Sequence, residues 1–99
     1  MPDSGVRVVA RVVARPGKIE ELRAVLQGLI EPTRRESGCV TYELLQNTAD
    51  PTDFTFVEEW SSEAELDAHL QSAHLRNARS RLSDLVAAAP DIRRYTVVG

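Results

Sequence analysis

The sequence predicts an α+β domain in which an antiparallel sheet of four strands carries helices on one face. Four short segments are rich in β-branched residues or alternate in polarity, and longer segments between them have apolar residues at helical spacing. Their order is strand, helix, strand, strand, helix, strand, which is the split βαβ arrangement. A chain of 99 residues holds one core, so residues 1–99 are expected to form a single domain.

The first half of the chain predicts one strand and one helix. Residues 6–14 read VRVVARVVA, so one row of this strand is wholly apolar and should face the helices, while the other row mixes arginine with valine. A Pro-Gly pair ends the strand. Residues 18–36 carry an apolar stripe at helical spacing, in which Pro32 should kink the helix or begin a fresh turn. Gly38 is expected to cap the end of this helix.

Two adjacent strands follow. Residues 39–46 predict the second strand, with Val40 and Tyr42 in the same row. Residues 47–52 contain a proline and predict a turn longer than two residues. The third strand covers residues 54–60, and the row that should face the helices holds Phe54, Phe56, Glu58 and Trp60.

The last part of the chain predicts two further helical segments and a strand. Ser62 and Glu65 have the spacing of a capping box, so a helix should begin there. Ser72 is expected to open a new helix, whose apolar stripe continues until Pro90 stops it. Residues 92–98 predict the fourth strand.

Composition limits the classes of partner. The net charge of −3 argues against nucleic acid as a partner. A single cysteine allows no internal disulfide and fits a reducing compartment. No apolar run approaches about 18 residues, and the N-terminus lacks the pattern of a signal peptide. We therefore expect a cytoplasmic protein without a membrane partner.

The second face of the sheet needs a cover. It would expose several valines, among them Val9, Val13, Val57 and Val98. A domain of this size buries only about two-thirds of its unfolded surface, so a monomer with an internal cavity would be marginally stable. A second copy of the chain is the expected cover, which predicts a homodimer.

Ring-bearing and titratable side chains gather around the second and third strands and the helix that follows. A carboxylate in an apolar row costs several kcal/mol unless it is paired, so Glu58 should contact an arginine, a histidine or a backbone amide, either as a structural salt bridge or in a pocket. His69 borders the buried stripe of its helix, where a half-buried structural histidine is the alternative to a base. Trp60 and Tyr42 are equally compatible with core packing.

A metal site is not expected. His69 and His74 are five residues apart, so on one continuous helix they would point about 140° apart, and no third ligand is evident. Cys39 is interpreted as a small buried residue. A set of arginines is interpreted as solvated charge on the last helix and strand edge, one of which, not identified by the sequence, could hold a substrate anion: Arg76, Arg79, Arg81, Arg93 and Arg94.

The order of these motifs resembles the antibiotic biosynthesis monooxygenase domain. The shared run is GC-x-x-Y-x-L, then DP-x-x-F-x-F-x-E-x-W, then AHL-x-S-x-H, which here begins at Gly38 and ends at His74. The resemblance implies a ferredoxin-like subunit, a dimeric α+β barrel, and a pocket between sheet and helices. Haem-degrading members carry an asparagine on the first strand near the position of Ala10, so this chain departs from them.

The resemblance also implies a chemistry. Its best-known members oxidise quinols or polycyclic phenols with dioxygen and without metal or flavin, so an aromatic substrate, dioxygen and no cofactor are expected. In this interpretation the site residues are His69, Trp60 and Glu58 as catalytic groups and Tyr42, Phe56 and His74 as substrate-binding groups. Two alternatives remain: an isomerase or signal-processing enzyme that uses the same pocket for proton transfer, and a dimer that binds a small ligand without catalysis.

Overall fold

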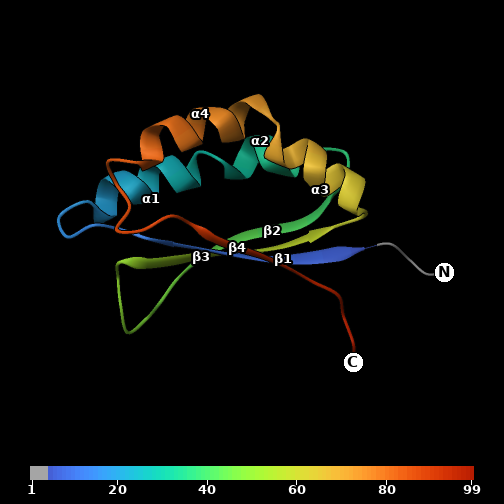
Figure 1. The fold of residues 1–99 in the computed structure, drawn as a ribbon, viewed down its shortest axis with the longest axis horizontal. Coiled ribbons are helices and arrows are strands. Elements are labelled where there is room, and N and C mark those ends of the chain that lie inside the picture. Colours follow the sequence, from blue (N-terminus) through green and yellow to red (C-terminus); the bar gives the residue numbers. More distant parts are fainter. Residues whose placement is uncertain (1–4) are drawn as a thin grey trace.

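A computed structural model describes residues 5–99, and the predicted α+β order is confirmed (Figure 1). The long helical segments are each divided in two. The elements are β1 (Val6–Val13), α1 (Ile19–Gln27), α2 (Ile30–Arg34), β2 (Cys39–Gln46), β3 (Asp53–Trp60), α3 (Glu63–Leu70), α4 (Ala73–Leu82) and β4 (Asp91–Tyr95).

The sheet has the strand order β2-β3-β1-β4, and each neighbouring pair is antiparallel. All helices lie on one side of it (Figure 1). The predicted inward rows are confirmed, because the core includes Val8, Phe54 and Trp60, each at most 1% exposed. Burial of these apolar side chains between sheet and helices is the main source of the fold's stability.

A β-bulge sets the register of β2. Cys39 pairs with Trp60 and Thr41 pairs with Glu59, so Val40 is an extra residue on this strand. The prediction that Val40 and Tyr42 share a row is therefore wrong: Val40 is 55% exposed, whereas Tyr42 is 2% exposed. The bulge places Tyr42 directly opposite Glu58 on the inner face.

The first long helix is broken earlier than predicted. It ends at Gln27, and α2 begins at Ile30, so the break lies before Pro32. A proline has no N–H to donate to the carbonyl four residues earlier, here that of Gly28, and its ring clashes with that carbonyl. Pro32 instead occupies the first turn of α2, where backbone N–H groups need no helical partner.

The last helix ends earlier than predicted, at Leu82 rather than near Pro90. The chain beyond it pairs with the end of β1: Ala87 N donates to Val13 O at 2.8 Å, and Arg15 N donates to Leu85 O at 2.9 Å. These long-range backbone bonds replace helical ones, and residues 83–90 therefore form a closing segment between α4 and β4.

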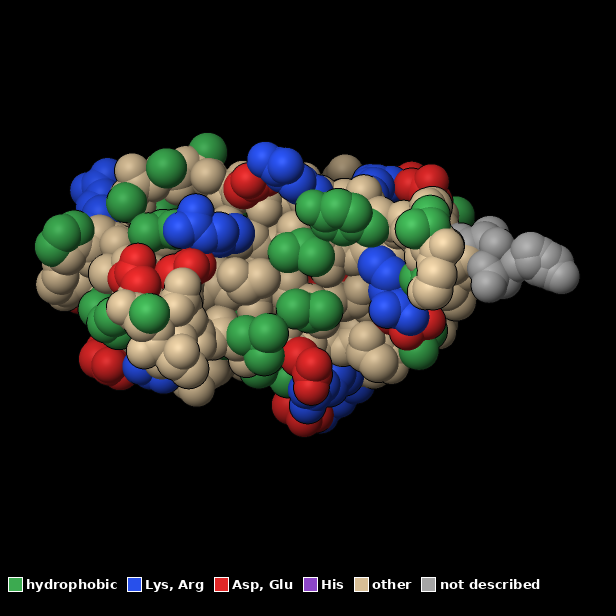
Figure 2. Space-filling view, turned by 90° about the horizontal axis from the view of Figure 1, so that it is seen from below, with side chains coloured by type: hydrophobic (Ala, Val, Ile, Leu, Met, Phe, Trp, Pro, Cys, Tyr) green, Lys and Arg blue, Asp and Glu red, His purple; other side chains and the backbone are tan. Residues whose placement is uncertain are grey.

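The outer face of the sheet is partly apolar. Figure 2 shows apolar side chains gathered near its centre with charged groups around them. The exposed residues include Val9 at 36%, Leu45 at 48% and Tyr95 at 46%. Arg7 pairs with Glu59 across this face, with 3.5 Å between their charged atoms. Within residues 5–99, no helix has the length and apolar character needed to cross a bilayer.

Candidate functional site

A cavity of about 620 Å³ lies between the inner face of the sheet and the helices. Its wall is mostly apolar, with side chains from β1, β3, α1, α3, α4 and the closing segment. The polar side chains that line it are Arg15, Tyr42, Glu58, His69, Arg79 and Ser83. A concave, largely apolar space with a few polar groups is the usual form of a small-molecule site.

Four of the six site residues predicted from the sequence line this cavity, namely Tyr42, Phe56, Glu58 and His69. Trp60 and His74 lie outside the lining, although both contact residues within it. The indole of Trp60 is fully buried, and its ring centroid lies 4.6 Å from that of His69. Trp60 therefore acts on the cavity through its neighbours.

Glu58 is paired with Trp60 rather than with a cation. The indole Nε1 donates to Oε1 of Glu58 at 2.8 Å, and Glu58 itself is 4% exposed. Burial raises the pKa of Glu58 to about 7, against the lowering effect of the Trp60 hydrogen bond. Among the described residues no ion pair of Glu58 is found, so the expected structural salt bridge is absent there.

His69 is oriented by a residue that the sequence did not single out, Glu36. Nδ1 of His69 lies 2.7 Å from Oε2 of Glu36, and the His69 side chain is 3% exposed. A carboxylate oxygen accepts hydrogen bonds, so the imidazole proton lies on Nδ1 and the lone pair lies on Nε2. Burial lowers the pKa of His69, while the bond to Glu36 acts in the opposite direction.

His74 meets the same carboxylate oxygen. Its Nε2 lies 2.8 Å from Oε2 of Glu36, and the two imidazole centroids are 6.1 Å apart. The expectation that the two histidines diverge is wrong, because the helix is interrupted: α3 ends at Leu70, and Ser72 caps α4. Glu36, His69 and His74 are the group in the described chain that could hold a metal, with ligand atoms within 4.8 Å of one another.

Aromatic packing fixes the wall beside His69. The ring of Tyr42 stacks on Phe56 with 4.8 Å between centroids and meets His69 edge-on at 5.7 Å. Burial, and next the nearby charge of Glu58, raise the pKa of Tyr42 far above its usual value, so its hydroxyl stays protonated. The rings provide a rigid surface on which a flat aromatic molecule can pack.

Two functional candidates, Glu36 and Arg15, were not identified from the sequence, and Arg79 was named there only as one of several arginines that could hold a substrate anion. Glu36 lies in the short connection between α2 and β2, where no helical or strand periodicity identifies it as a site residue. Arg15 and Arg79 lie at the rim of the cavity, and both are exposed. Only the fold brings these residues together, because they are far apart in the sequence.

Comparison with known proteins gives the family. Residues 5–81 match the family model described as antibiotic biosynthesis monooxygenase. A Mycobacterium tuberculosis protein named "Putative monooxygenase Rv0793" is 39% identical over 83 residues, covering 84% of this chain and 81% of that protein. Its solved structure superimposes with a TM-score of 0.92 over 97% of each chain, at 31% identity. An uncharacterised Synechocystis protein is 32% identical over 96% of this chain, which spans 65% of that protein's length. The chain belongs to the antibiotic biosynthesis monooxygenase family.

Proposed function

We propose that this protein is a cofactor-independent monooxygenase that oxidises a quinol or polycyclic phenol with dioxygen. The observation that carries the proposal is the Glu36–His69 pair at the wall of an apolar cavity of about 620 Å³. Family membership supports a monooxygenase reaction. The aromatic walls formed by Tyr42 and Phe56 support a flat aromatic substrate.

His69 is the base in this proposal. With its Nδ1 proton directed to Glu36, Nε2 can accept the hydroxyl proton of a quinol, and the carboxylate stabilises the imidazolium that forms. The apolar cavity disfavours solvation of the resulting anion, which favours electron transfer from the anion to dioxygen. Recombination of the two radicals forms a carbon–oxygen bond and a peroxide.

Glu58 completes the proton transfers. Its pKa of about 7 lets it both give and take a proton near neutral pH. When the peroxide oxygen–oxygen bond breaks, the departing oxygen takes a proton from Glu58 or the His69 imidazolium and leaves as water, while the hydrogen on the peroxide-bearing carbon is lost as a proton to the deprotonated group and that carbon becomes a carbonyl. The sum is balanced, because one quinol and one dioxygen give one hydroxylated quinone and one water. Trp60 serves as a positioning residue for Glu58.

The test is oxygen consumption with a panel of hydroquinones. We expect at least one quinol to be oxidised faster than in buffer, with incorporation of one atom from ¹⁸O₂, and His69→Ala to remove most of this rate. Activity should survive exhaustive treatment with a chelator. If no quinol exceeds the buffer rate, if His69→Ala is as active as the wild type, or if a metal is required to restore turnover, the proposal fails.

A proton-transferring isomerase is the second candidate. It is favoured by one observation, the presence of two titratable groups, Glu58 and His69, in the same cavity. An anaerobic assay separates the candidates, because isomerisation continues without dioxygen and monooxygenation stops.

We also propose that the outer face of the sheet is covered by a second copy of the chain. The partly exposed apolar residues at its centre support this, since they would otherwise stay in water. Sedimentation should give twice the mass of the chain, and Val9→Lys should reduce it to that of a single chain. A wild-type monomer at micromolar concentration would contradict the dimer.

A further inference from the structure

The rim of the cavity has a charge opposite to that of the whole chain. The charged side chains that line the cavity are those of Arg15, Arg79 and Glu58. The two arginines are exposed at the rim, whereas Glu58 is buried. The chain as a whole carries a net charge of −3. Positive charge concentrated at the opening of an apolar cavity raises the local concentration of anions. The site is therefore suited to a ligand that carries a negative group.

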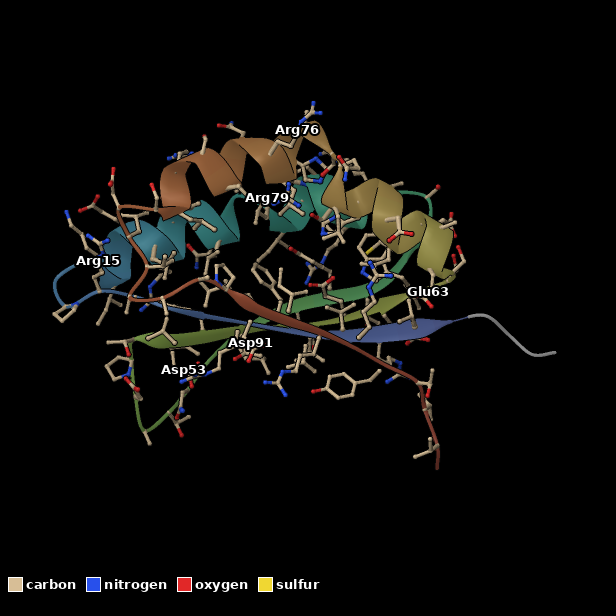
Figure 3. All side chains as sticks on the ribbon, in the orientation of Figure 1. Arg15, Asp53, Glu63, Arg76, Arg79 and Asp91 are labelled. Atoms are coloured by element: carbon tan, nitrogen blue, oxygen red, sulfur yellow. The ribbon has the colours of Figure 1, made fainter. Side chains whose placement is uncertain are left out.

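Arg79 is distinguished from its neighbour Arg76 by the side of α4 that it occupies. Figure 3 shows Arg76 on the outer side of α4 and Arg79 on the side that faces the sheet. Of the two, only Arg79 lines the cavity. Both side chains are exposed, so they differ in the side of α4 on which they lie and not in burial.

The Arg79 guanidinium is held in place with hydrogen-bonding capacity to spare. One nitrogen, Nη2, donates to the carbonyl oxygen of Leu70 at 2.6 Å. A guanidinium has five N–H donors, and its fork matches a carboxylate in two parallel bonds. Arg15 is engaged more fully, since its Nε donates to Val86 O and its Nη2 to Ser83 O, which fastens the closing segment.

Arg79 also lies within electrostatic reach of the proposed base. Its positive charge is among the influences that lower the pKa of His69. Both side chains line the same cavity, so one bound molecule can contact the rim arginine and the imidazole together. Leu70 and Leu75 belong to the apolar wall of this cavity.

We propose that the cavity takes an aromatic substrate bearing a carboxylate, which pairs with the Arg79 guanidinium at the mouth while a ring hydroxyl reaches Nε2 of His69. The hydroxyl end of this arrangement rests on the proposed function, whereas the carboxylate end does not. Arg79 thus determines which phenols are selected.

The test compares two matched ligands by isothermal titration calorimetry. 6-Hydroxy-2-naphthoate and 2-naphthol differ by the carboxylate alone. We expect the wild type to bind the naphthoate about tenfold more tightly, the scale of a charge-assisted pair at a partly exposed site. Arg79→Gln should remove this preference and leave 2-naphthol binding unchanged, and Arg76→Gln should retain it.

A second variant, Arg79→Lys, distinguishes loss of the guanidinium from a general effect on folding. Arg79→Lys keeps the charge but loses the fork, so it should retain part of the preference and lose it in high salt. The proposal is overturned if the wild type binds both ligands equally, if neither binds, or if Arg76→Gln and Arg79→Gln act alike. Carboxylate selection without oxygen consumption would refute the proposed function alone, and quinol oxidation without carboxylate selection would refute this inference alone.

Discussion

The indole nitrogen of Trp60 donates a 2.8 Å hydrogen bond to a carboxylate oxygen of Glu58, two residues earlier on the same strand. Alternate residues of a strand point to the same face, so both side chains enter the core from β3. This bond is the interaction by which the fold accommodates a buried carboxylate that forms no ion pair within residues 5–99. It also couples the most buried aromatic ring to the chemistry of the cavity.

Trp60→Phe should raise the pKa of Glu58 above its value of about 7. The indole bond favours the charged carboxylate, so its loss leaves burial and the nearby charge of Glu36 to raise the pKa unopposed. The variant should also lose about 1–3 kcal/mol of stability, because a buried acceptor loses its donor. Infrared titration of the protonated carboxyl band measures the midpoint, and Glu58→Gln identifies the band. An unchanged midpoint would show that the bond has no influence on the charge of Glu58.

Glu58→Gln should stabilise the protein in alkaline solution. The pKa of Glu58 is about 7 in the folded state, compared with an ordinary value of 4.5 that applies to the unfolded chain. Between these values the folded state holds a proton that the unfolded state has released, so stability falls as pH rises through this window and levels off above it. Glutamine is neutral at all pH values and can still accept from Trp60.

The expected gain for Glu58→Gln is roughly 1–3 kcal/mol at pH 8, with little difference at pH 4. Urea unfolding at several pH values measures it. Asp84→Asn is the matched control for loss of a carboxylate, because Asp84 is exposed. A Glu58→Gln variant that is less stable than the wild type at pH 8 would contradict the raised pKa.

The strands and the helix starts were predictable because their signals are local, whereas the cap expected at Gly38 is wrong, since α2 ends at Arg34 and Arg35 caps it. The alternation in β1 and β3 identified the inner row, and the capping residues Ser62 and Ser72 both cap helices as predicted, with Glu65 N and Leu75 N donating to their hydroxyls. The row that contains Glu58 was therefore identifiable from sequence. Its partner was not, since the pattern pointed equally to an arginine, a histidine or a backbone amide.

The rest of the site depends on contacts between distant parts of the chain. Glu36 and His69 are 33 residues apart, and no periodicity links a short connection to a helix. The end of α4 at Leu82 was missed because backbone pairing with Val13 and Arg15 overrides an apolar stripe that fits a helix. The convergence of His69 and His74 was missed because the sequence predicts the start of a new helix at Ser72 but not the angle between the two helices that meet there.

Gly38→Ala should destabilise the fold. The backbone angles at Gly38 do not require a glycine, since Gly17 is the glycine with positive φ among the described residues. Space requires it instead, because a Cβ at this position would overlap the Cβ of Glu65 in α3. The connection that carries Glu36 therefore lies directly against α3, and a methyl group would push the two apart. We expect a loss of about 1–3 kcal/mol in urea unfolding.

Gly28→Ala is the matched control for this substitution. Gly28 adopts right-handed helical angles, and its nearest neighbours to an added Cβ are at 3.4 Å. It should be neutral or stabilise by about 0.5–1 kcal/mol. Equal effects of the two substitutions would mean that the approach of Gly38 to α3 is not tight.

Glu36→Gln should weaken the base without removing it. Glutamine can still accept from Nδ1 of His69, so the ring keeps its orientation, but the negative charge that stabilises the imidazolium is lost. The pKa of His69 should fall further below its ordinary value, and the acidic limb of the kcat/KM profile should move to lower pH. We expect kcat for the quinol to fall roughly ten- to a hundredfold. NMR titration of the His69 ring gives the same pKa without any substrate.

His74→Asn tests the hydrogen-bond network around Glu36 while leaving the negative charge of Glu36 unchanged. It removes the second imidazole at Oε2 of Glu36 and leaves the Glu36–His69 bond in place. Since the charge of Glu36 remains, kcat should change by less than about threefold, and the pKa of His69 should rise rather than fall, because His74 is among the groups that lower it. If His74→Asn were as damaging as Glu36→Gln, the three residues would act as one unit, and the base could not be described as a Glu36–His69 pair.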